Sequence, residues 1–166
     1  MKKIFSLLCF VLAVASVSAQ QLPDVKVENA QGKIVSVREL SNGKPMIISY
    51  WSIACKPCIQ ELNAINDALA DWKSEAEFEV VAVSVDDARL KASAKAIANS
   101  RGWEFICVYD ENQELKRAMN VSLTPQSFVV DGEGNIIFSH SGYTPGSEQL
   151  LFDKIVELKK GLKKKK

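Results

Sequence analysis

The stretch that decides the fold is Trp51-Ser52-Ile53-Ala54-Cys55-Lys56-Pro57-Cys58-Ile59-Gln60-Glu61-Leu62. Upstream of it, the apolar run at residues 46–51 is typical of a buried strand. Downstream, apolar residues recur at steps of four and three, as they do on one face of a helix: Cys58, Leu62, Ile65, Leu69 and Trp72. The sequence therefore predicts a core strand that leads directly into a helix, with Cys55 at the start of that helix.

Cys55 and Cys58 form a Cys-x-x-Cys pair at this junction. The unpaired amide groups and the dipole at a helix start favour an anion, which here is the thiolate of Cys55. Cys58 lies on the apolar face about one turn later, so we expect it to be less exposed. Two thiols at this spacing can close a disulfide and reopen it, and a strand followed by such a pair indicates redox chemistry.

The composition fits one compact domain behind an export signal. The chain has 166 residues, of which 47% are hydrophobic and 25% are charged. Residues 1–19 predict a cleaved secretory signal peptide, because Lys2 and Lys3 precede an apolar run that ends in Val17-Ser18-Ala19. A retained membrane anchor is the alternative, but the run is short for a membrane span. We therefore expect an exported, periplasmic domain at residues 20–160.

Export leaves three cysteines in the mature chain, since Cys9 lies within the predicted signal. Cys107 is left over beside the Cys-x-x-Cys pair, and its apolar surroundings predict a buried, inert thiol.

The chain ends in a basic tail at residues 161–166, preceded by Lys159 and Lys160. Such a tail can bind an anionic membrane or a polyanion, and the alternative is a solvated chain end.

The rest of the chain predicts an α/β domain. Before the strand and helix described above, we expect a β-hairpin around a turn at residues 29–33 and a short turn at 38–40. After them we expect a strand at 78–85, a helix from about 90 to Gly102, a strand at 103–109 and a short helix at 112–119. The chain then continues with a hairpin of strands 127–130 and 136–140 and a helix from about 144. Strands that alternate with helices pair in parallel and hairpin strands pair antiparallel, so we expect a mixed sheet with helices on both faces.

Several short motifs now form an ordered set. They are Leu22-Pro23-Asp24, Gly32-Lys33, Tyr50-Trp51, Cys55-Lys56-Pro57-Cys58, and Thr124-Pro125 ahead of Phe128-Val129-Val130-Asp131 and Gly134. From about Leu22 to Leu158 the chain resembles the thioredoxin superfamily, and more narrowly the exported TlpA-like thiol-disulfide oxidoreductases, which include reductases of cytochrome c maturation. The resemblance implies a thioredoxin-like fold with an added N-terminal β-hairpin. It also implies a protein-disulfide reductase that needs no cofactor.

The resemblance also implies roles for single residues. Cys55 resembles the attacking thiol and Cys58 the resolving thiol. Pro125 resembles the cis-proline beside the disulfide, and an X-Pro bond is chemically able to be cis. The expected substrate-binding residues around the pair are Trp51, Lys56, Pro57, Thr124 and Pro125.

Two departures from the family pattern bear on the site. Ala54 stands where relatives commonly have an aromatic residue, which leaves a smaller rim beside Cys55. Ser49 stands where thioredoxin has a buried acid. TlpA-like reductases often place an acid after the next strand, and Asp87, next to Asp86, is the best match. We expect Asp87 to take the proton of Cys58, and helix capping by Asp87 is the alternative.

The expected partners are protein disulfides or dithiols and an upstream thiol electron donor, either in the membrane or soluble, with no nucleic acid and no second subunit.

Two other classes of function need weighing. A peroxiredoxin usually has a Thr or Ser three residues before its reactive cysteine and a Pro seven before; Ser52 fits, whereas Ile48 does not. A metal carrier, for copper above all, would use the cysteine pair, but a closed zinc site needs four ligands and the lone His140 lies far along the chain.

Overall fold

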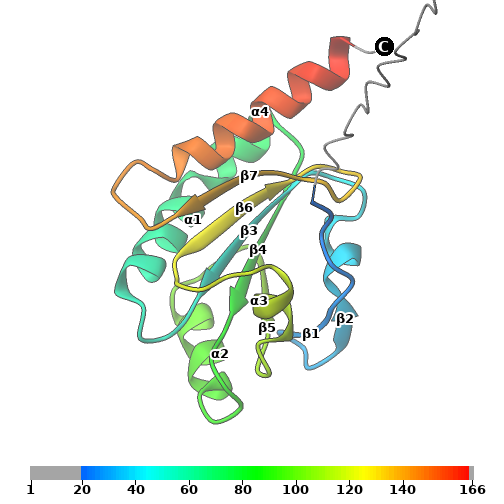
Figure 1. The fold of residues 1–166 in the computed structure, drawn as a ribbon. Coiled ribbons are helices and arrows are strands. Elements are labelled where there is room, and N and C mark those ends of the chain that lie inside the picture. The colour runs from blue at the N-terminus through cyan, green and yellow to red at the C-terminus, as the bar shows by residue number, and fades with distance from the viewer. Residues whose placement is uncertain (1–19, 165–166) are drawn as a thin grey trace, which may run out of the picture.

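The computed structural model describes residues 20–164, so the predicted signal peptide at residues 1–19 lies outside the described residues. The described chain forms one seven-stranded sheet with helices on both faces (Figure 1). The elements are β1 (Lys26–Asn29), β2 (Ile34–Ser36), the 3-10 helix η1 (Val37–Ser41), β3 (Met46–Trp51), α1 (Lys56–Glu75), β4 (Glu79–Ser84), α2 (Lys91–Ser100), β5 (Ile106–Tyr109), α3 (Glu114–Ala118), β6 (Gln126–Val130), β7 (Ile136–Ser141) and α4 (Gln149–Lys164).

The strands lie in the order β2-β1-β5-β4-β3-β6-β7. Strands β3, β4 and β5 are parallel, whereas β6 and β1 join them antiparallel on either side. Strand β3 lies between β4 and β6, and all six of its residues are buried. A strand covered on both faces needs a continuous apolar run, which explains the sequence of β3.

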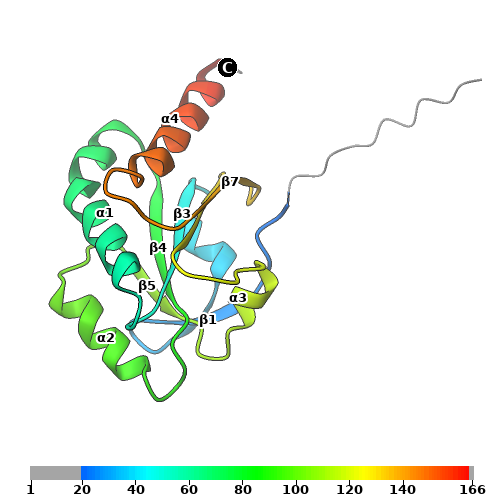
Figure 2. The same cartoon turned by 60° about the vertical axis from the view of Figure 1, so that its left-hand side comes forward.

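The helices divide into two layers, which Figure 2 shows to the left and right of the sheet. Helices α1, α2 and α4 cover one face, and the shorter α3 and η1 cover the other. On the first face, Trp72 of α1 stacks on Phe152 of α4 with ring centroids 4.7 Å apart. On the second face, Val37 and Leu115 pack with the buried strand residue Ile48. The predicted thioredoxin-like architecture, including the N-terminal hairpin, is confirmed.

Two elements begin three or more residues later than predicted. Strand β5 begins at Ile106 rather than at residue 103, because α1 holds the preceding segment: the indole Nε1 of Trp103 donates to Asn63. Helix α4 begins at Gln149 rather than near 144, after turns in which the amide of Ser147 donates to the carbonyl of Thr144. It then continues to Lys164, so the tail boundary predicted at residue 161 falls inside a helix.

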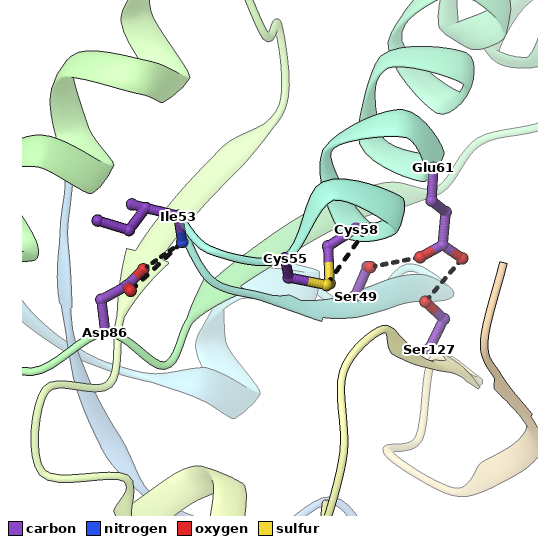
Figure 3. Close-up of a disulfide and its surroundings, with 7 residues drawn as sticks. All are labelled: Ser49, Ile53, Cys55, Cys58, Glu61, Asp86 and Ser127. Atoms are coloured by element: carbon purple, nitrogen blue, oxygen red, sulfur yellow. Dashed lines mark hydrogen bonds between the residues drawn. A yellow bond between two sulfur atoms is a disulfide. The ribbon is translucent and has the colours of Figure 1, made fainter.

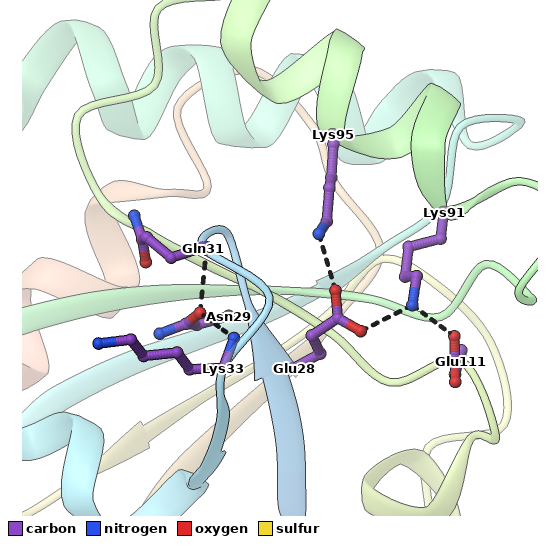
Figure 4. Close-up of polar contacts among 7 residues, drawn as sticks. All are labelled: Glu28, Asn29, Gln31, Lys33, Lys91, Lys95 and Glu111. Carbon is purple, nitrogen blue, oxygen red and sulfur yellow. Dashed lines mark hydrogen bonds and ion pairs between the residues drawn. The ribbon is translucent and has the colours of Figure 1, made fainter.

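The N-terminal hairpin is tied to the rest of the domain by charge (Figure 4). The carboxylate of Glu28 accepts from Lys91 and from Lys95 of α2, each at 2.7 Å. Lys91 also pairs with Glu111 at 2.8 Å. Within the hairpin turn, the side chain of Asn29 accepts from the backbone amide of Lys33. The network therefore joins β1 to the helix layer next to β5.

Candidate active site

A disulfide joins Cys55 and Cys58 where β3 passes into α1 (Figure 3). After β3, the chain turns so that the amide of Cys55 donates to the carbonyl of Ser52. Cys55 then caps α1, because its Sγ accepts from the amide of Cys58 at 3.3 Å. Cys55 is half-buried and Cys58 is fully buried, as the position of Cys58 on the apolar face predicts. A partner can therefore approach Cys55 more directly than Cys58.

A buried carboxylate anchors the loop in front of Cys55. The amide of Ile53 donates to Asp86 Oδ2 at 3.0 Å (Figure 3). The hydroxyl of Ser84 donates to the same oxygen at 2.9 Å. The amide of Val85 also donates to the carbonyl of Trp51 at 2.9 Å. Burial raises the pKa of Asp86, and the hydrogen bonds oppose that rise. These contacts fix the loop from the end of β4.

Asp87 has a different environment from the one predicted. Its carboxylate accepts from the amides of Arg89 and Leu90 and pairs with the guanidinium of Arg89 at 2.7 Å. The hydrogen bond from Arg89 lowers the pKa of Asp87, which keeps it ionised. These contacts lie in the turn that precedes α2, and α2 itself begins at Lys91 without a side-chain cap, so helix capping by Asp87 is not seen either. Among the contacts of the described residues, none joins Asp87 to Cys58, so proton transfer by Asp87 stays a prediction without structural support.

A second buried acid, on the helix that carries Cys58, is Glu61, which the sequence reasoning missed. It is 1% exposed, and its carboxylate accepts from Ser49 of β3 and Ser127 of β6, each at 3.1 Å (Figure 3). Burial raises its pKa to about 7, and the two serine hydrogen bonds oppose that rise. Glu61 follows Cys58 by three residues, so both side chains lie on the same helix face. The missed signal was a charged residue on the apolar face of α1, opposite polar Ser49 and Ser127 in buried strands.

The predicted substrate-binding residues divide into two groups. Lys56 and Pro57 are exposed and Thr124 is half-buried, so a partner can reach them. Pro125 is buried, and the Thr124–Pro125 bond is cis, as the resemblance implied. Trp51 requires a correction, because its side chain is fully buried and packs edge-on against Trp103 at 4.9 Å. Trp51 supports the loop from within the core and offers no surface to a substrate.

Strand pairing brings the segment before β6 next to the disulfide loop. Tyr50 pairs with Gln126 and Ser49 pairs with Ser127, and continuing this register by one residue places Pro125 opposite Trp51. The hydrogen bond from Ser127 to Glu61 joins the same segment to α1. Thr124 and Pro125 therefore lie beside the loop that carries Cys55, although about 70 residues separate them in sequence.

The third cysteine of the described chain is inert by its environment. Cys107 is a free, buried thiol on β5, and burial raises its pKa to about 11. This confirms the prediction of a buried apolar role. In residues 20–164, no group of three or more His, Cys, Asp or Glu side chains is placed to hold a metal ion.

Comparison with known proteins now places the chain. A protein-family model described as the AhpC/TSA family matches residues 18–139. The chain belongs to the AhpC/TSA family. It is similar to the thiol-disulfide oxidoreductase ResA of Bacillus anthracis, with 26% identity over 118 residues that cover 71% of this chain and 66% of ResA. It is also similar to the thiol:disulfide interchange protein DsbE of Tatumella citrea, with 28% identity over 79% of this chain and 69% of DsbE. The chain thus spans about two thirds of the length of these relatives.

Solved structures of other proteins share the fold. A thioredoxin-like protein from Porphyromonas gingivalis is 46% identical and superposes with a TM-score of 0.74 over 82% of this chain and 90% of that protein. The bacterioferritin comigratory protein of Xanthomonas campestris, described by its alkyl peroxide reduction activity, superposes with a TM-score of 0.71 over 84% of this chain and 98% of that protein at 18% identity. The second likeness shows the shared fold alone. In residues 20–164, no helix is long and apolar enough to span a membrane.

Proposed function

We propose that this member of the AhpC/TSA family is a thiol-disulfide oxidoreductase that exchanges the Cys55–Cys58 disulfide with protein substrates. One observation carries the proposal: a half-buried Cys55 at the start of α1 is bonded to a fully buried Cys58. This arrangement separates an accessible attacking sulfur from a protected resolving sulfur. The ResA and DsbE relatives, which are named for this chemistry, support it.

The exchange conserves electrons in two steps. In the reduced protein, the thiolate of Cys55 attacks one sulfur of a substrate disulfide, and the other substrate sulfur leaves as a thiolate. The thiolate of Cys58 then attacks Cys55, which releases the first substrate sulfur and closes Cys55–Cys58. The substrate gains two electrons and the protein loses two. A donor dithiol must return them by the same exchange.

We further propose that Glu61 accepts the proton of Cys58 during the second step. A general base works best when its pKa lies near the working pH, and burial raises the pKa of Glu61 to about 7. The hydrogen bonds from Ser49 and Ser127 hold the carboxylate on the helix face that carries Cys58. Glu61 thus takes the role first predicted for Asp87.

The cellular setting completes the proposal. Residues 1–19 act as a cleaved signal peptide, and the exported monomer works in the periplasm as a reductase that receives electrons from a membrane or soluble thiol donor. The resemblance to TlpA-like reductases supports this direction. Alkylation of cell samples quenched with acid tests it. Cys55 and Cys58 should be mostly reduced at steady state, and a fully oxidised pair would favour an oxidase.

Insulin reduction in the presence of a dithiol tests the activity itself. We expect Cys55→Ser to abolish turnover, because the attacking sulfur is lost. Cys107→Ser is the matched control and should retain turnover, since this buried thiol is inert. Equal loss in both variants would overturn the assignment of the pair.

A peroxidase is the second candidate, because AhpC/TSA membership and the fold of peroxide-reducing relatives are compatible with it. Ser52 matches the peroxiredoxin pattern, whereas Ile48 replaces its proline. Consumption of hydrogen peroxide by the reduced protein separates the two candidates. A peroxide rate that exceeds the insulin rate would favour the peroxidase.

A further inference from the structure

The most exposed large hydrophobic side chain of the described residues is Leu123, which is 81% exposed. Single exposed hydrophobic residues are common on protein surfaces, so exposure alone assigns no role. The position of Leu123 is what distinguishes it. It lies two residues before Pro125, in the segment that strand pairing places beside the disulfide loop.

The backbone just before Pro125 is unpaired within the described residues. Leu123 and Thr124 lie outside the strands and helices, and neither takes part in a backbone hydrogen bond among the described residues. From Pro125 onward the chain is fixed, because the carbonyl of Pro125 accepts from Gly142 and Gln126 pairs with Tyr50. A peptide that pairs with a fixed, open backbone gains affinity from the main chain and specificity from the neighbouring side chains.

The surface around Cys55 is also largely apolar. Ile53 and Ile59 are half-buried and, like Cys55, pack against the core cluster that contains Trp51 and Cys58. Ala54 and Pro57 are exposed. Lys56, the first residue of α1, is the charged residue next to Cys55. Because Ala54 is small, it leaves the approach to Cys55 open. The side chains on the α1 side of the disulfide are therefore largely apolar, and Leu123 stands just before β6, the strand that pairs with β3.

We propose that Leu123 makes this protein select substrates that carry an apolar side chain next to the target cysteine. The inference rests on the proposed exchange function and names the substrate class for it. When the substrate cysteine reaches Cys55, the neighbouring apolar side chain covers Leu123 and removes both surfaces from water. A substrate with a polar side chain at that place leaves Leu123 exposed.

Two peptides test the proposal in a single turnover. Each is a symmetric dimer joined by one disulfide, with leucine on both sides of the cysteine in one peptide and serine in the other. The reduced full chain is mixed with each dimer, and tryptophan fluorescence follows closure of Cys55–Cys58 as two peptide thiols are released. We expect the leucine dimer to react about tenfold faster, the size of effect that partial burial of one leucine gives.

Variants then assign the preference to its residue. Leu123→Ser should bring the ratio of the two rates close to one, whereas Leu123→Met should keep most of it. Ile34→Ser is the matched control, because Ile34 is 63% exposed on the far edge strand β2 and should leave the ratio unchanged. A wild-type ratio near one, or a full ratio in Leu123→Ser, would overturn the inference alone. Failure of the wild-type protein to reduce either dimer would overturn the proposed function, and the inference with it.

Discussion

Glu61 illustrates how one buried side chain links stability to pH. Its carboxyl group is 1% exposed, and burial disfavours the ionised form, so the folded pKa is about 7 against 4.5 for an ordinary glutamate. Between these values the folded protein keeps a proton that the unfolded chain has lost. The stability that this proton contributes is complete below about pH 4.5 and is lost as the pH rises through 7.

Glu61→Gln should remove this pH dependence. A neutral amide has no proton to lose. The free energy of unfolding of the variant, relative to that of the wild type, should therefore rise by about 2 to 3 kcal/mol between pH 5 and pH 8. Urea unfolding of the oxidised proteins at both pH values measures the gain. Glu133→Gln, at an exposed position, is the control and should show none. If the free energies of unfolding of Glu61→Gln and wild type differed by the same amount at both pH values, the Glu61 carboxyl group would not be buried with a raised pKa.

At the scale of elements, the N-terminal hairpin depends on its contacts with α2 and β5. Strand β1 has four residues and pairs with β5 at only two positions, Glu28 with Tyr109 and Asn29 with Val108. Two strands with so little pairing need further contacts to stay docked. The partly buried ion pairs of Glu28 with Lys91 and Lys95 supply them, and hydrogen bonds from these lysines lower the pKa of Glu28.

A double-mutant cycle of Glu28→Gln and Lys95→Met should give a coupling energy of about 1 kcal/mol, because the pair is partly shielded from water. Because the pKa of Glu28 is lowered in the folded protein, the stabilisation from its ion pairs depends on pH. It is present above about pH 4.5 and is lost as the pH falls. The pair Lys154–Glu157 on α4 is the control, where exposure should hold the coupling to about 0.3–0.5 kcal/mol. Chemical denaturation at pH 7 and pH 3 measures both cycles, and equal coupling in the two pairs would refute the docking role.

At the scale of the whole molecule, α4 closes the helix layer that covers the disulfide side of the sheet. Phe152 stacks on Trp72 of α1 and also contacts Phe78, which precedes β4. Buried Leu151 and Ile155 extend this contact along the same helix. The last helix in the chain therefore packs against the helix that carries Cys55 and Cys58, and the two form one core.

Phe152→Ala should lower the free energy of unfolding by about 3–5 kcal/mol, the usual cost of a cavity left by a buried phenylalanine. Unfolding of the variant should remain a single transition when followed by fluorescence and by circular dichroism, because α1 and α4 share one core. Leu150→Ala is the matched control on the same helix, where Leu150 is exposed and the change should cost little. Similar losses in both variants would show that α4 is not part of the core.

The local patterns of the sequence were sufficient for the elements and their order. The apolar run of β3 and the helical spacing of α1 placed Cys55 and Cys58 at one junction, and the hairpin at residues 126–141 followed from its turn residues. Tertiary structure decided the rest of the candidate site. Glu61 contacts Ser49 and Ser127, which lie 12 and 66 residues away, and Asp86 reaches Ile53 across 33 residues.

Those contacts could not be predicted because they depend on how three elements pack. The predictions for Trp51 and Asp87 lack structural support for the same reason. An aromatic residue before a cysteine pair can bind substrate, but Trp51 packs against Trp103 in the core. An acid after a strand can accept a proton, but Asp87 pairs with Arg89. Periodicity in a sequence records which face of an element is buried. Which groups meet across that face, and hence the pKa of a carboxyl such as Glu61, is set only when sheet and helices enclose it together.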